Sequence, residues 1–225
     1  MRSIIVTGGF GILGGAVAKA FRDNGDRVAR VDFAAAAPDA NPGGADFGGI
    51  DLTDGDAAAS VASQVIAAHG GIDVLVNVAG GFTWQTLADG DPETWVRMFS
   101  MNATTCVTMT KAALPVLSST AGAAIVNIGA GGALVAAAGM GGYAASKAAV
   151  HKLTESLAAE LVGNDCTVNA VLPSIIDTPT NRADMPDADF SQWVKPDALA
   201  QVILYLASPA ARAISGALIP VSRGG

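Results

Sequence analysis

Charge, cysteine, histidine and aromatic rings are all scarce in this chain of 225 residues. Charged side chains make up 15% of it and aromatic ones 5%, and there are two cysteines and two histidines. Cys106 and Cys166 lie far apart and form no Cys-x-x-Cys pair, so we expect two reduced, partly buried thiols. The acidic residues Asp184, Asp187 and Asp189 lack the calcium-loop pattern and its terminal glutamate, so no metal site is expected there.

Long uninterrupted apolar runs are also missing, although 51% of the residues are hydrophobic. No stretch of about 18 to 20 residues is free of glycine clusters and polar breaks, which argues against a membrane-spanning helix. The hydrophobic excess is mostly alanine and glycine, which suits helices packed closely on a parallel sheet buried on both faces. With 20 acidic and 13 basic residues the net charge is −7, so neither nucleic acid nor an anionic membrane is expected as a partner.

The N-terminal segment resembles a signal peptide in composition, because Arg2 is followed by an apolar stretch. However, residues 3–6 have the pattern of a strand, and the glycines that follow fall at turn spacing. We therefore expect a cytoplasmic protein whose first strand begins at once.

Strand-like apolar runs alternate with helical patterns along the sequence. The predicted strands cover residues 3–6, 27–33, a weak segment near Ile50, 72–81, 123–129, 167–173 and 217–222, and residues 38–49 are expected to form a loop. The predicted helices cover residues 13–23, 53–69, 92–117, 142–162 and 195–208. This alternation predicts a single α/β domain over residues 1–225, a Rossmann-type doubly wound parallel sheet of about seven strands. The polar residues 178–195 are predicted to form a lid.

A glycine-rich turn separates the first predicted strand from the first helix. Gly9, Gly11 and Gly14 match the Gly-x-Gly-x-x-Gly dinucleotide fingerprint. Glycine lets a pyrophosphate approach the helix N-terminus, whose free N–H groups favour anions. The predicted cofactor residues of this turn are Gly8, Gly9, Phe10, Gly11, Ile12 and Leu13.

Asp32 ends the second predicted strand, where a carboxylate can accept the ribose hydroxyls of the adenosine half and would repel a 2′-phosphate. NAD(H) is therefore the preferred cofactor. NADP(H) stays an alternative because Arg30, on the same strand face, could reach a phosphate. Asp51 and Leu52 are predicted to lie at the adenine edge.

Small residues follow the fourth predicted strand. They would let the backbone of Asn77, Ala79 and Gly80 lie against the cofactor. The alternative for Asn77 is that it only forms the turn.

Tyr143 and Lys147 lie four positions apart near the start of a predicted helix, so both face the same way. A free tyrosine has a pKa of about 10 and is a poor proton relay near neutrality. We expect the lysine cation to lower the pKa of Tyr143, and its ammonium group can also bind the nicotinamide ribose.

These motifs together resemble the short-chain dehydrogenase/reductase family over nearly the whole chain. The matching pieces are the turn at 7–15, "DLTD" at 51–54, "NVAG" at 77–80, "MNATT" at 101–105, "YAASK" at 143–147 and "LPSIIDTPT" at 172–180. The resemblance implies hydride transfer from nicotinamide, with Tyr143 as proton donor, Lys147 as its tuner and ribose anchor, and Asn102 supporting a proton-relay water. It also implies cofactor contacts from Pro173, Ile176 and Thr178, of which the last two would hold the carboxamide.

Two departures from the family pattern match one of its branches, dihydropteridine reductase. The family's turn reads Thr-Gly-x-x-x-Gly-x-Gly, whereas this chain has Ile12 and places the glycine at Gly11. The family's substrate-binding serine would fall at Ala130. The chain is most similar to this branch in "GMGGYAASKAAVHKLTESLA" and "AVLPSIIDTPTNRADMPDADFSQW".

The missing serine hydroxyl suits a conjugated C=N substrate, whose nitrogen is more basic than a carbonyl oxygen and needs less polarisation. Ala130 leaves room for a flat ring on which Phe82 or Trp84 would stack. The alternative for Trp84 is packing against the lid or a neighbouring subunit. His151 has no acid at triad spacing and is expected to be a packing or interface residue.

The sequence therefore predicts an NADH-dependent reductase of a quinonoid dihydropteridine or a similar conjugated heterocycle. One alternative is a carbonyl or alcohol oxidoreductase that acts on a small molecule, and another is a non-catalytic dinucleotide-sensing protein. The alanine- and glycine-rich faces of helices 92–117 and 142–162 predict a homodimer or homotetramer.

Overall fold

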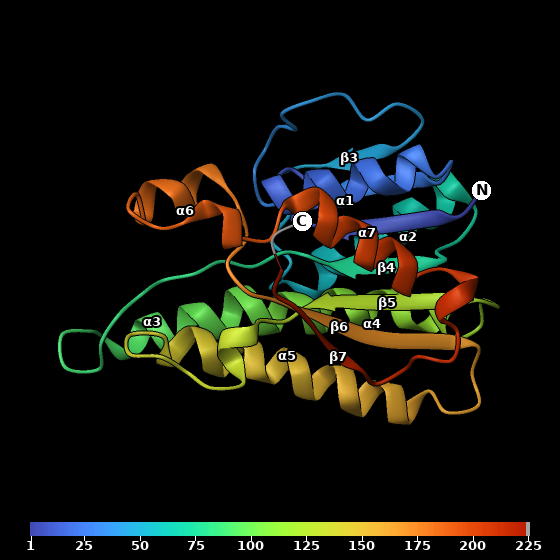
Figure 1. Cartoon of the computed structure of the whole chain (residues 1–225). Helices are drawn as coiled ribbons and strands as arrows, with labels where there is room; N and C mark the ends of the chain where they lie inside the picture. The colour runs from blue at the N-terminus through green and yellow to red at the C-terminus, as the bar shows by residue number, and fades with distance from the viewer. Residues whose placement is uncertain (224–225) are drawn as a thin grey trace.

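A parallel sheet of seven strands lies at the centre of the molecule, in the order β3-β2-β1-β4-β5-β6-β7. The computed structural model describes residues 1–223. Its strands are β1 (Ser3–Thr7), β2 (Arg27–Val31), β3 (Ala45–Phe47), β4 (Val74–Asn77), β5 (Ala123–Ile128), β6 (Cys166–Pro173) and β7 (Leu218–Val221). Helices cover both faces of the sheet (Figure 1), so the predicted Rossmann-type fold is confirmed.

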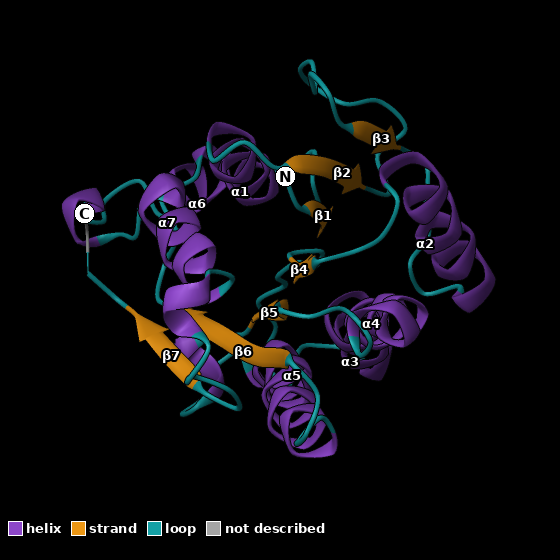
Figure 2. Ribbon diagram, turned by 90° about the vertical axis from the view of Figure 1, so that its right-hand side faces the viewer, coloured by secondary structure: helices purple, strands orange, loops and turns teal. Residues whose placement is uncertain are grey.

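The helices divide between the two faces of the sheet. They are α1 (Ile12–Asp23), α2 (Gly55–His69), α3 (Pro92–Phe99), α4 (Thr105–Leu117), α5 (Gly141–Glu160), α6 (Pro179–Asp184) and α7 (Pro196–Leu206). Figure 2 shows α1 and α7 on one face and α2, α4 and α5 on the other. Among residues 1–223, no helix is long and apolar enough to cross a membrane.

Burial on both faces explains why the inner strands are almost continuously apolar. Successive strand residues point to opposite faces. Accordingly, Ile4 packs in one hydrophobic cluster with Phe21 of α1, while Ile5 packs in a second cluster with Val65 of α2. All residues of β1, β4, β5 and β6 are buried. The carboxyl ends of these strands therefore meet at one edge, where the site lies.

The predicted third strand near Ile50 is wrong, because β3 lies within the segment expected to be a loop. Its middle residue Asp46 pairs with Arg30 of β2 in the ladder. After Phe47 the chain turns through two glycines, and the Ile50 N–H donates a hydrogen bond to the carbonyl oxygen of Asp32. A three-residue edge strand with a charged centre has no apolar alternation that a sequence pattern can detect.

The predicted helix over residues 92–117 forms, but one turn in it is widened. Asp91 caps α3 by accepting a 2.6 Å hydrogen bond from the Thr94 N–H, and Pro92 occupies the first turn, as predicted. Residues Ser100–Thr104 then form a π-helical turn before α4 begins. Such turns often occur at functional sites, and this one contains Asn102.

The predicted lid is folded and anchored at its end. Thr178 caps α6, and Arg182 of α6 forms an ion pair with Asp177. Trp193 and Val194 are buried, which differs from the expectation that this segment is too polar for the core, because Val194 pairs with Ile176 and packs in the core. In Figure 1 the α6 segment extends away from the sheet, above α3.

Close packing inside the glycine turn is testable through stability. A Cβ on Gly14 would lie 2.0 Å from the carbonyl oxygen of Gly8, whereas a Cβ on the neighbouring Gly15 would meet nothing within 4 Å. Gly14→Ala should lower the free energy of unfolding by about 2 kcal/mol, since the backbone must shift. Gly15→Ala should raise it by about 0.5–1 kcal/mol through helix propensity. Urea denaturation measures both, and equal stability of the two variants would contradict the close approach.

Candidate active site

The glycine turn forms a cradle at the edge of the sheet. Gly8 has a φ of +61°, and a Cβ on it would lie 3.0 Å from the backbone of Ala79, so the turn after β1 touches the turn after β4. Gly11 precedes α1 and offers no side-chain cap, which leaves the first N–H groups of the helix free for a ligand. Exposed backbone donors at a helix start fit the pyrophosphate of a dinucleotide. Of the predicted residues beyond it, Ile12 is exposed and Leu13 is half-buried.

Asp32 joins this cradle to the end of β2. One carboxylate oxygen accepts a 2.9 Å hydrogen bond from the Phe10 N–H, and the other accepts a 3.0 Å bond from the Ala34 N–H. The side chain is only partly buried. It therefore lies beside the turn, as a ribose-binding carboxylate requires.

Arg30 does not reach the cofactor side of this edge. Its side chain is 0% exposed and forms ion pairs with Asp39 and Asp46. The hydrogen bonds that Arg30 donates to the Asp46 carboxylate raise the pKa of Arg30 above its ordinary value, and the guanidinium carbon lies 5.4 Å from the centroid of the Phe10 ring. The guanidinium is thus already neutralised by two carboxylates.

The remaining predicted adenine and nicotinamide residues differ in orientation. Asp51 is exposed, and hydrogen bonds from Thr53 lower the pKa of its carboxyl group. Leu52 is buried beneath it. Gly80 is exposed and its Cβ position would lie 2.4 Å from Asn102 Oδ1, so glycine is needed for this turn to pass the π-helical turn.

The side chain of Asn77 points into the protein. Its amide nitrogen donates hydrogen bonds to Thr110 (3.0 Å) and Asn127 (2.9 Å), and the residue is buried. Asn127 in turn donates to Thr154 of α5. Asn77 therefore ties β4 to α4 and β5 beneath the predicted site instead of presenting its amide to a ligand.

The pair Tyr143 and Lys147 lies on the first turns of α5. The ring of Phe82 meets that of Tyr143 edge-on, with 5.0 Å between the centroids. Lys147 is buried, and its Nζ donates a 2.8 Å hydrogen bond to the carbonyl oxygen of Ile128 at the end of β5. The residues that carry the predicted chemistry therefore lie at the carboxyl ends of β4 and β5.

Burial controls both pKa values in this pair. It raises the pKa of Tyr143 to about 12 and lowers that of Lys147 to about 8. The prediction that the lysine lowers the tyrosine pKa is wrong for this arrangement, because the ammonium group is directed at the Ile128 carbonyl. Tyr143 is consequently a protonated donor throughout the neutral range.

Asn102 connects three parts of the site. Its Oδ1 accepts a 3.0 Å hydrogen bond from the Gly81 N–H, while its Nδ2 donates to the Gly81 carbonyl oxygen at 3.0 Å and to Ser146 Oγ at 3.1 Å. Ser146 Oγ donates to the carbonyl oxygen of Tyr143. The side chain thus holds the turn after β4 against α5, and both of its N–H donors are used.

Ala130 directly follows β5 and is buried. Its N–H donates a 3.2 Å hydrogen bond to Nε2 of His151, which is on α5. His151 was expected to be a packing or interface residue, and the sequence signal for this contact was its position four residues after Lys147. Neither a hydroxyl group nor a free N–H is therefore offered at residue 130.

Trp84 packs on the loop that precedes α5, and the residue remains 60% exposed, so stacking on a substrate stays a prediction. Its indole Nε1 donates a 3.0 Å hydrogen bond to the Ala138 carbonyl oxygen, and a Cβ on Gly139 would lie 2.1 Å from the ring. A second tryptophan, Trp95, lies against the next glycines, because a Cβ on Gly141 would be 2.9 Å from its ring and one on Gly142 would be 3.4 Å away. Gly139 and Gly141 are thus required by two indole rings, which the sequence pattern did not predict.

The end of β6 completes the edge of the site. A Cβ on Gly131 would lie 3.5 Å from the carbonyl oxygen of Pro173, so the ends of β5 and β6 are in contact. The N–H of Asn181 donates to the hydroxyl of Thr178, and its side chain donates to the carbonyl oxygen of Ile176 at 2.8 Å. These bonds fix the segment predicted to hold a carboxamide.

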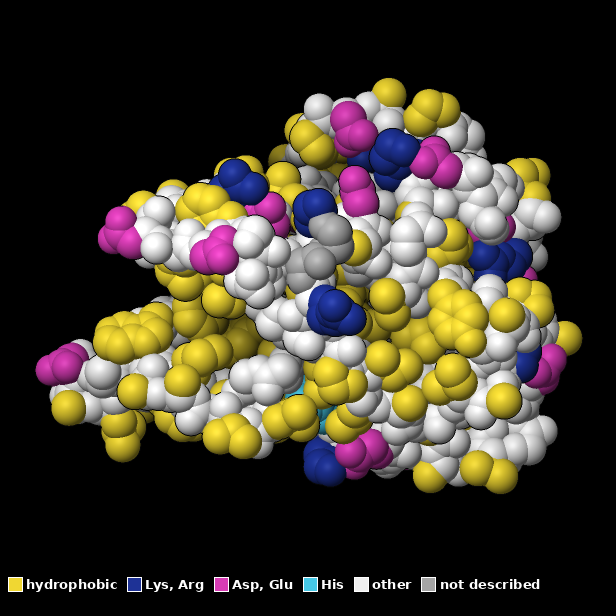
Figure 3. Space-filling model, in the orientation of Figure 1, with side chains coloured by type: hydrophobic (Ala, Val, Ile, Leu, Met, Phe, Trp, Pro, Cys, Tyr) yellow, Lys and Arg dark blue, Asp and Glu magenta, His cyan; other side chains and the backbone are white. Residues whose placement is uncertain are grey.

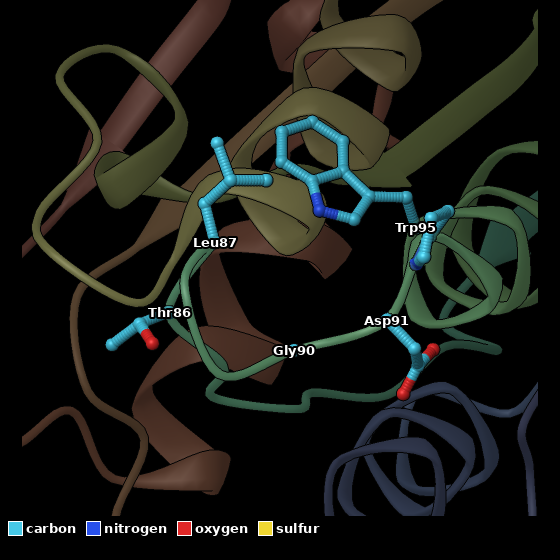
Figure 4. Close-up of a pocket in the computed structure, with 6 residues that line it drawn as sticks. Thr86, Leu87, Gly90, Asp91 and Trp95 are labelled. Atoms are coloured by element: carbon cyan, nitrogen blue, oxygen red, sulfur yellow. The ribbon is translucent and has the colours of Figure 1, made fainter.

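The molecular surface is hollowed between the α6 segment and the segment that carries α3. In Figure 3 this hollow is lined mostly by hydrophobic side chains. A separate cavity of about 290 Å³ lies beside the loop before α3 and is lined by Leu87, Asp91 and Trp95, among others (Figure 4). None of the predicted site residues lines that cavity. Within residues 1–223, no three His, Cys, Asp or Glu side chains are grouped to hold a metal ion.

Comparisons of the sequence with known proteins identify its family. The profile of the enoyl-(acyl carrier protein) reductase family matches residues 11–225. The chain is 31% identical to a cis-4-hydroxycyclohexanecarboxylate dehydrogenase of Sinomonas cyclohexanicum over 99% of this chain and 96% of that one. It is 31% identical to a 3-oxoacyl-[acyl-carrier-protein] reductase of Thermotoga maritima over 81% and 78% of the two chains.

Solved structures give the same result. A short-chain dehydrogenase/reductase of Brucella melitensis, described as a glucose/ribitol dehydrogenase, superimposes with a TM-score of 0.88 at 28% identity, covering 98% and 94% of the two chains. A 3-ketoacyl-(acyl-carrier-protein) reductase of Brucella melitensis complexed with NADH gives 0.86 at 25% identity, covering 98% and 96%. The chain belongs to the short-chain dehydrogenase/reductase family and is an NAD(P)-dependent oxidoreductase.

Proposed function

We propose that this enzyme is an NADH-dependent reductase of a flat, conjugated heterocycle with a C=N bond, of the quinonoid dihydropteridine type. The observation that carries the proposal is the absence of a hydrogen-bond donor at Ala130, whose N–H is already bound to His151. A carbonyl substrate develops oxyanion charge and loses about 10²–10³ in rate when one such donor is missing. A basic ring nitrogen depends less on that donor.

The chain's own residues supply a proton and a binding surface. Tyr143, whose pKa is about 12, holds its proton until a basic substrate nitrogen takes it. Phe82 is 52% exposed and lies against Tyr143, so its free face can stack on a flat ring. Gly8, Gly11 and Asp32 would hold the cofactor, with Lys147 at its nicotinamide ribose. When bound, the cofactor supplies the hydride.

A second candidate is the reduction of a ketone or the oxidation of an alcohol. It is supported by the names of the relatives, which are dehydrogenases of hydroxylated compounds and reductases of 3-oxoacyl groups. The missing donor at Ala130 argues against it, since Tyr143 alone would then have to stabilise the developing alkoxide.

Substrate turnover distinguishes the two candidates. We expect the wild-type enzyme to oxidise NADH with quinonoid dihydropterin faster than with a panel of ketones and aldehydes. Tyr143→Phe should lower kcat with the pterin by about 10²-fold or more, because the proton donor is lost. The chain's other tyrosine, Tyr205 on α7, is half-exposed, and Tyr205→Phe is the matched control. Turnover of ketones alone would eliminate the pterin proposal.

The hydroxyl group absent from residue 130 can be restored. Ala130→Ser should raise kcat/KM for ketones by about 10-fold or more, because a second donor to the oxyanion appears. With the pterin we expect an unchanged or lower kcat/KM. A large gain with the pterin would show that the missing hydroxyl is a defect and not a feature of this substrate site.

We also propose a preference for NADH over NADPH, because Asp32 borders the cradle and Arg30 is neutralised by Asp39 and Asp46. Asp32→Ser should raise the KM for NADH by about 10-fold, as a charged hydrogen-bond acceptor is lost. The ratio of the KM for NADPH to the KM for NADH should also become smaller in this variant. Asp56→Ser, at an exposed position of α2, is the control. Tighter binding of NADPH by the wild-type enzyme would refute the preference.

We further propose that the protein associates with a second copy of itself through α4 and α5. Phe99 and Val107 are 50% and 45% exposed and border a shallow cavity that also contacts Val150 and Leu153 of α5. Light scattering should give the mass of a dimer or tetramer, and Val107→Asp should reduce it to that of one chain. Val162→Asp, outside this cavity, should leave the mass unchanged. A monomeric wild type would contradict the proposal.

A further inference from the structure

Helix α5 holds the end of β5 at two points that lie one helical turn apart. Lys147 donates a hydrogen bond to the carbonyl oxygen of Ile128, and His151 accepts one from the N–H of Ala130. The side chains of both residues belong to buried positions, and His151 is only 3% exposed. A donor, Lys147, and an acceptor, His151, on the same face of α5 therefore bind two residues at the end of β5 that are separated by one position.

The contact requires a neutral imidazole of defined tautomer. Because Nε2 accepts the Ala130 N–H, the ring proton must be on Nδ1. Burial and the neighbouring Lys147 both lower the pKa of His151, which keeps the ring neutral. Lys152 acts in the same direction, while Glu155 opposes it.

Gly129 lies between the two held residues and leaves the space that the imidazole fills. A Cβ on Gly129 would lie 2.5 Å from His151 Nε2 and 2.7 Å from its Cδ2. Leu172 would be the next neighbour, at 3.1 Å. The glycine and the histidine thus fit each other, and neither can be enlarged alone.

We propose that His151 is a positioning residue that fixes Ala130 for substrate binding and keeps its N–H turned away from the substrate. The inference rests on the proposed substrate role of Ala130, although it holds for either a pterin or a ketone substrate. Without the imidazole, the Ala130 N–H would lose its hydrogen-bond partner, and of the two side chains of α5 that bind the end of β5 only Lys147 would remain.

The test compares His151→Leu with His151→Gln, whose amide oxygen can accept the same N–H. The assay uses whichever substrate of the pterin and carbonyl panel the wild-type enzyme turns over best, so failure of the pterin proposal leaves this test intact. His151→Leu should raise the KM for that substrate by about 10-fold, since a buried donor loses its acceptor. The KM for NADH should change by less than about twofold.

His151→Gln should recover most of the affinity, and Lys152→Ala, at the exposed neighbouring position, should behave as the wild type. The proposal would be overturned if His151→Leu and His151→Gln raised the KM for substrate equally. It would also be overturned if His151→Leu raised the KM for substrate and the KM for NADH in parallel, or changed neither. Near-UV circular dichroism establishes that each variant is folded.

A second measurement remains informative if His151→Leu is unstable. Gly129→Ala should raise the KM for substrate, because the new methyl group displaces the imidazole. The double variant Gly129→Ala/His151→Ala is compared with the two single variants Gly129→Ala and His151→Ala. Because the smaller side chain at 151 makes room for the new methyl group, the fold increase in KM of the double variant should be less than the product of the two single increases. A fold increase equal to that product would show that the two residues do not act through one contact.

Discussion

The hydrogen bond between Lys147 and the carbonyl oxygen of Ile128 is the contact on which the site depends. An ammonium group removed from water is costly unless it is paired or hydrogen-bonded, and this carbonyl at the strand end supplies the partner. The bond sets the rotation of α5 against β5. Tyr143 lies one turn before Lys147 and His151 one turn after it, so the proposed proton donor and the residue that binds the Ala130 N–H are placed by the same contact. The lowered pKa of Lys147 reflects the burial that this position requires.

The adenosine end is organised by a different buried cation. Arg30 ties β2 to β3 and to the loop before it, through Asp46 and Asp39. A Cβ on Gly9 would lie 2.6 Å from the Cβ of Arg30, so the glycine turn packs directly against the arginine of this ion pair. Asp32 then stands beside the turn without a free cation on the same strand face. A buried cation thus lies at each end of the site. Arg30 is neutralised by two carboxylates, and Lys147 is hydrogen-bonded to a backbone carbonyl group of β5.

The parallel sheet and the shared helix of Tyr143 and Lys147 could be predicted, because strands buried on both faces are apolar and the spacing of a helix is regular. The ends of β2 and β4 were less well predicted, since the expected segments 27–33 and 72–81 extend past Val31 and Asn77. The three-residue β3 could not, since its partner contact is an ion pair that has no periodicity. The direction of the Lys147 ammonium group was also hidden, because helical spacing places two side chains on one face without fixing where each ends. The contacts of Trp84 and Trp95 join segments that lie far apart in the sequence, and no local sequence pattern predicts such contacts.

The contacts of Gly139 with Trp84 and of Gly141 with Trp95 have a consequence for protein engineering. A library that randomises these two glycines to alter substrate scope would lose many of its members, because a Cβ at either position would lie within 3.0 Å of an indole ring. Leu134 and Val135, on the same connection between β5 and α5, are 59% and 84% exposed. Diversity placed at these two exposed positions would leave the contacts of Trp84 and Trp95 with the glycines intact.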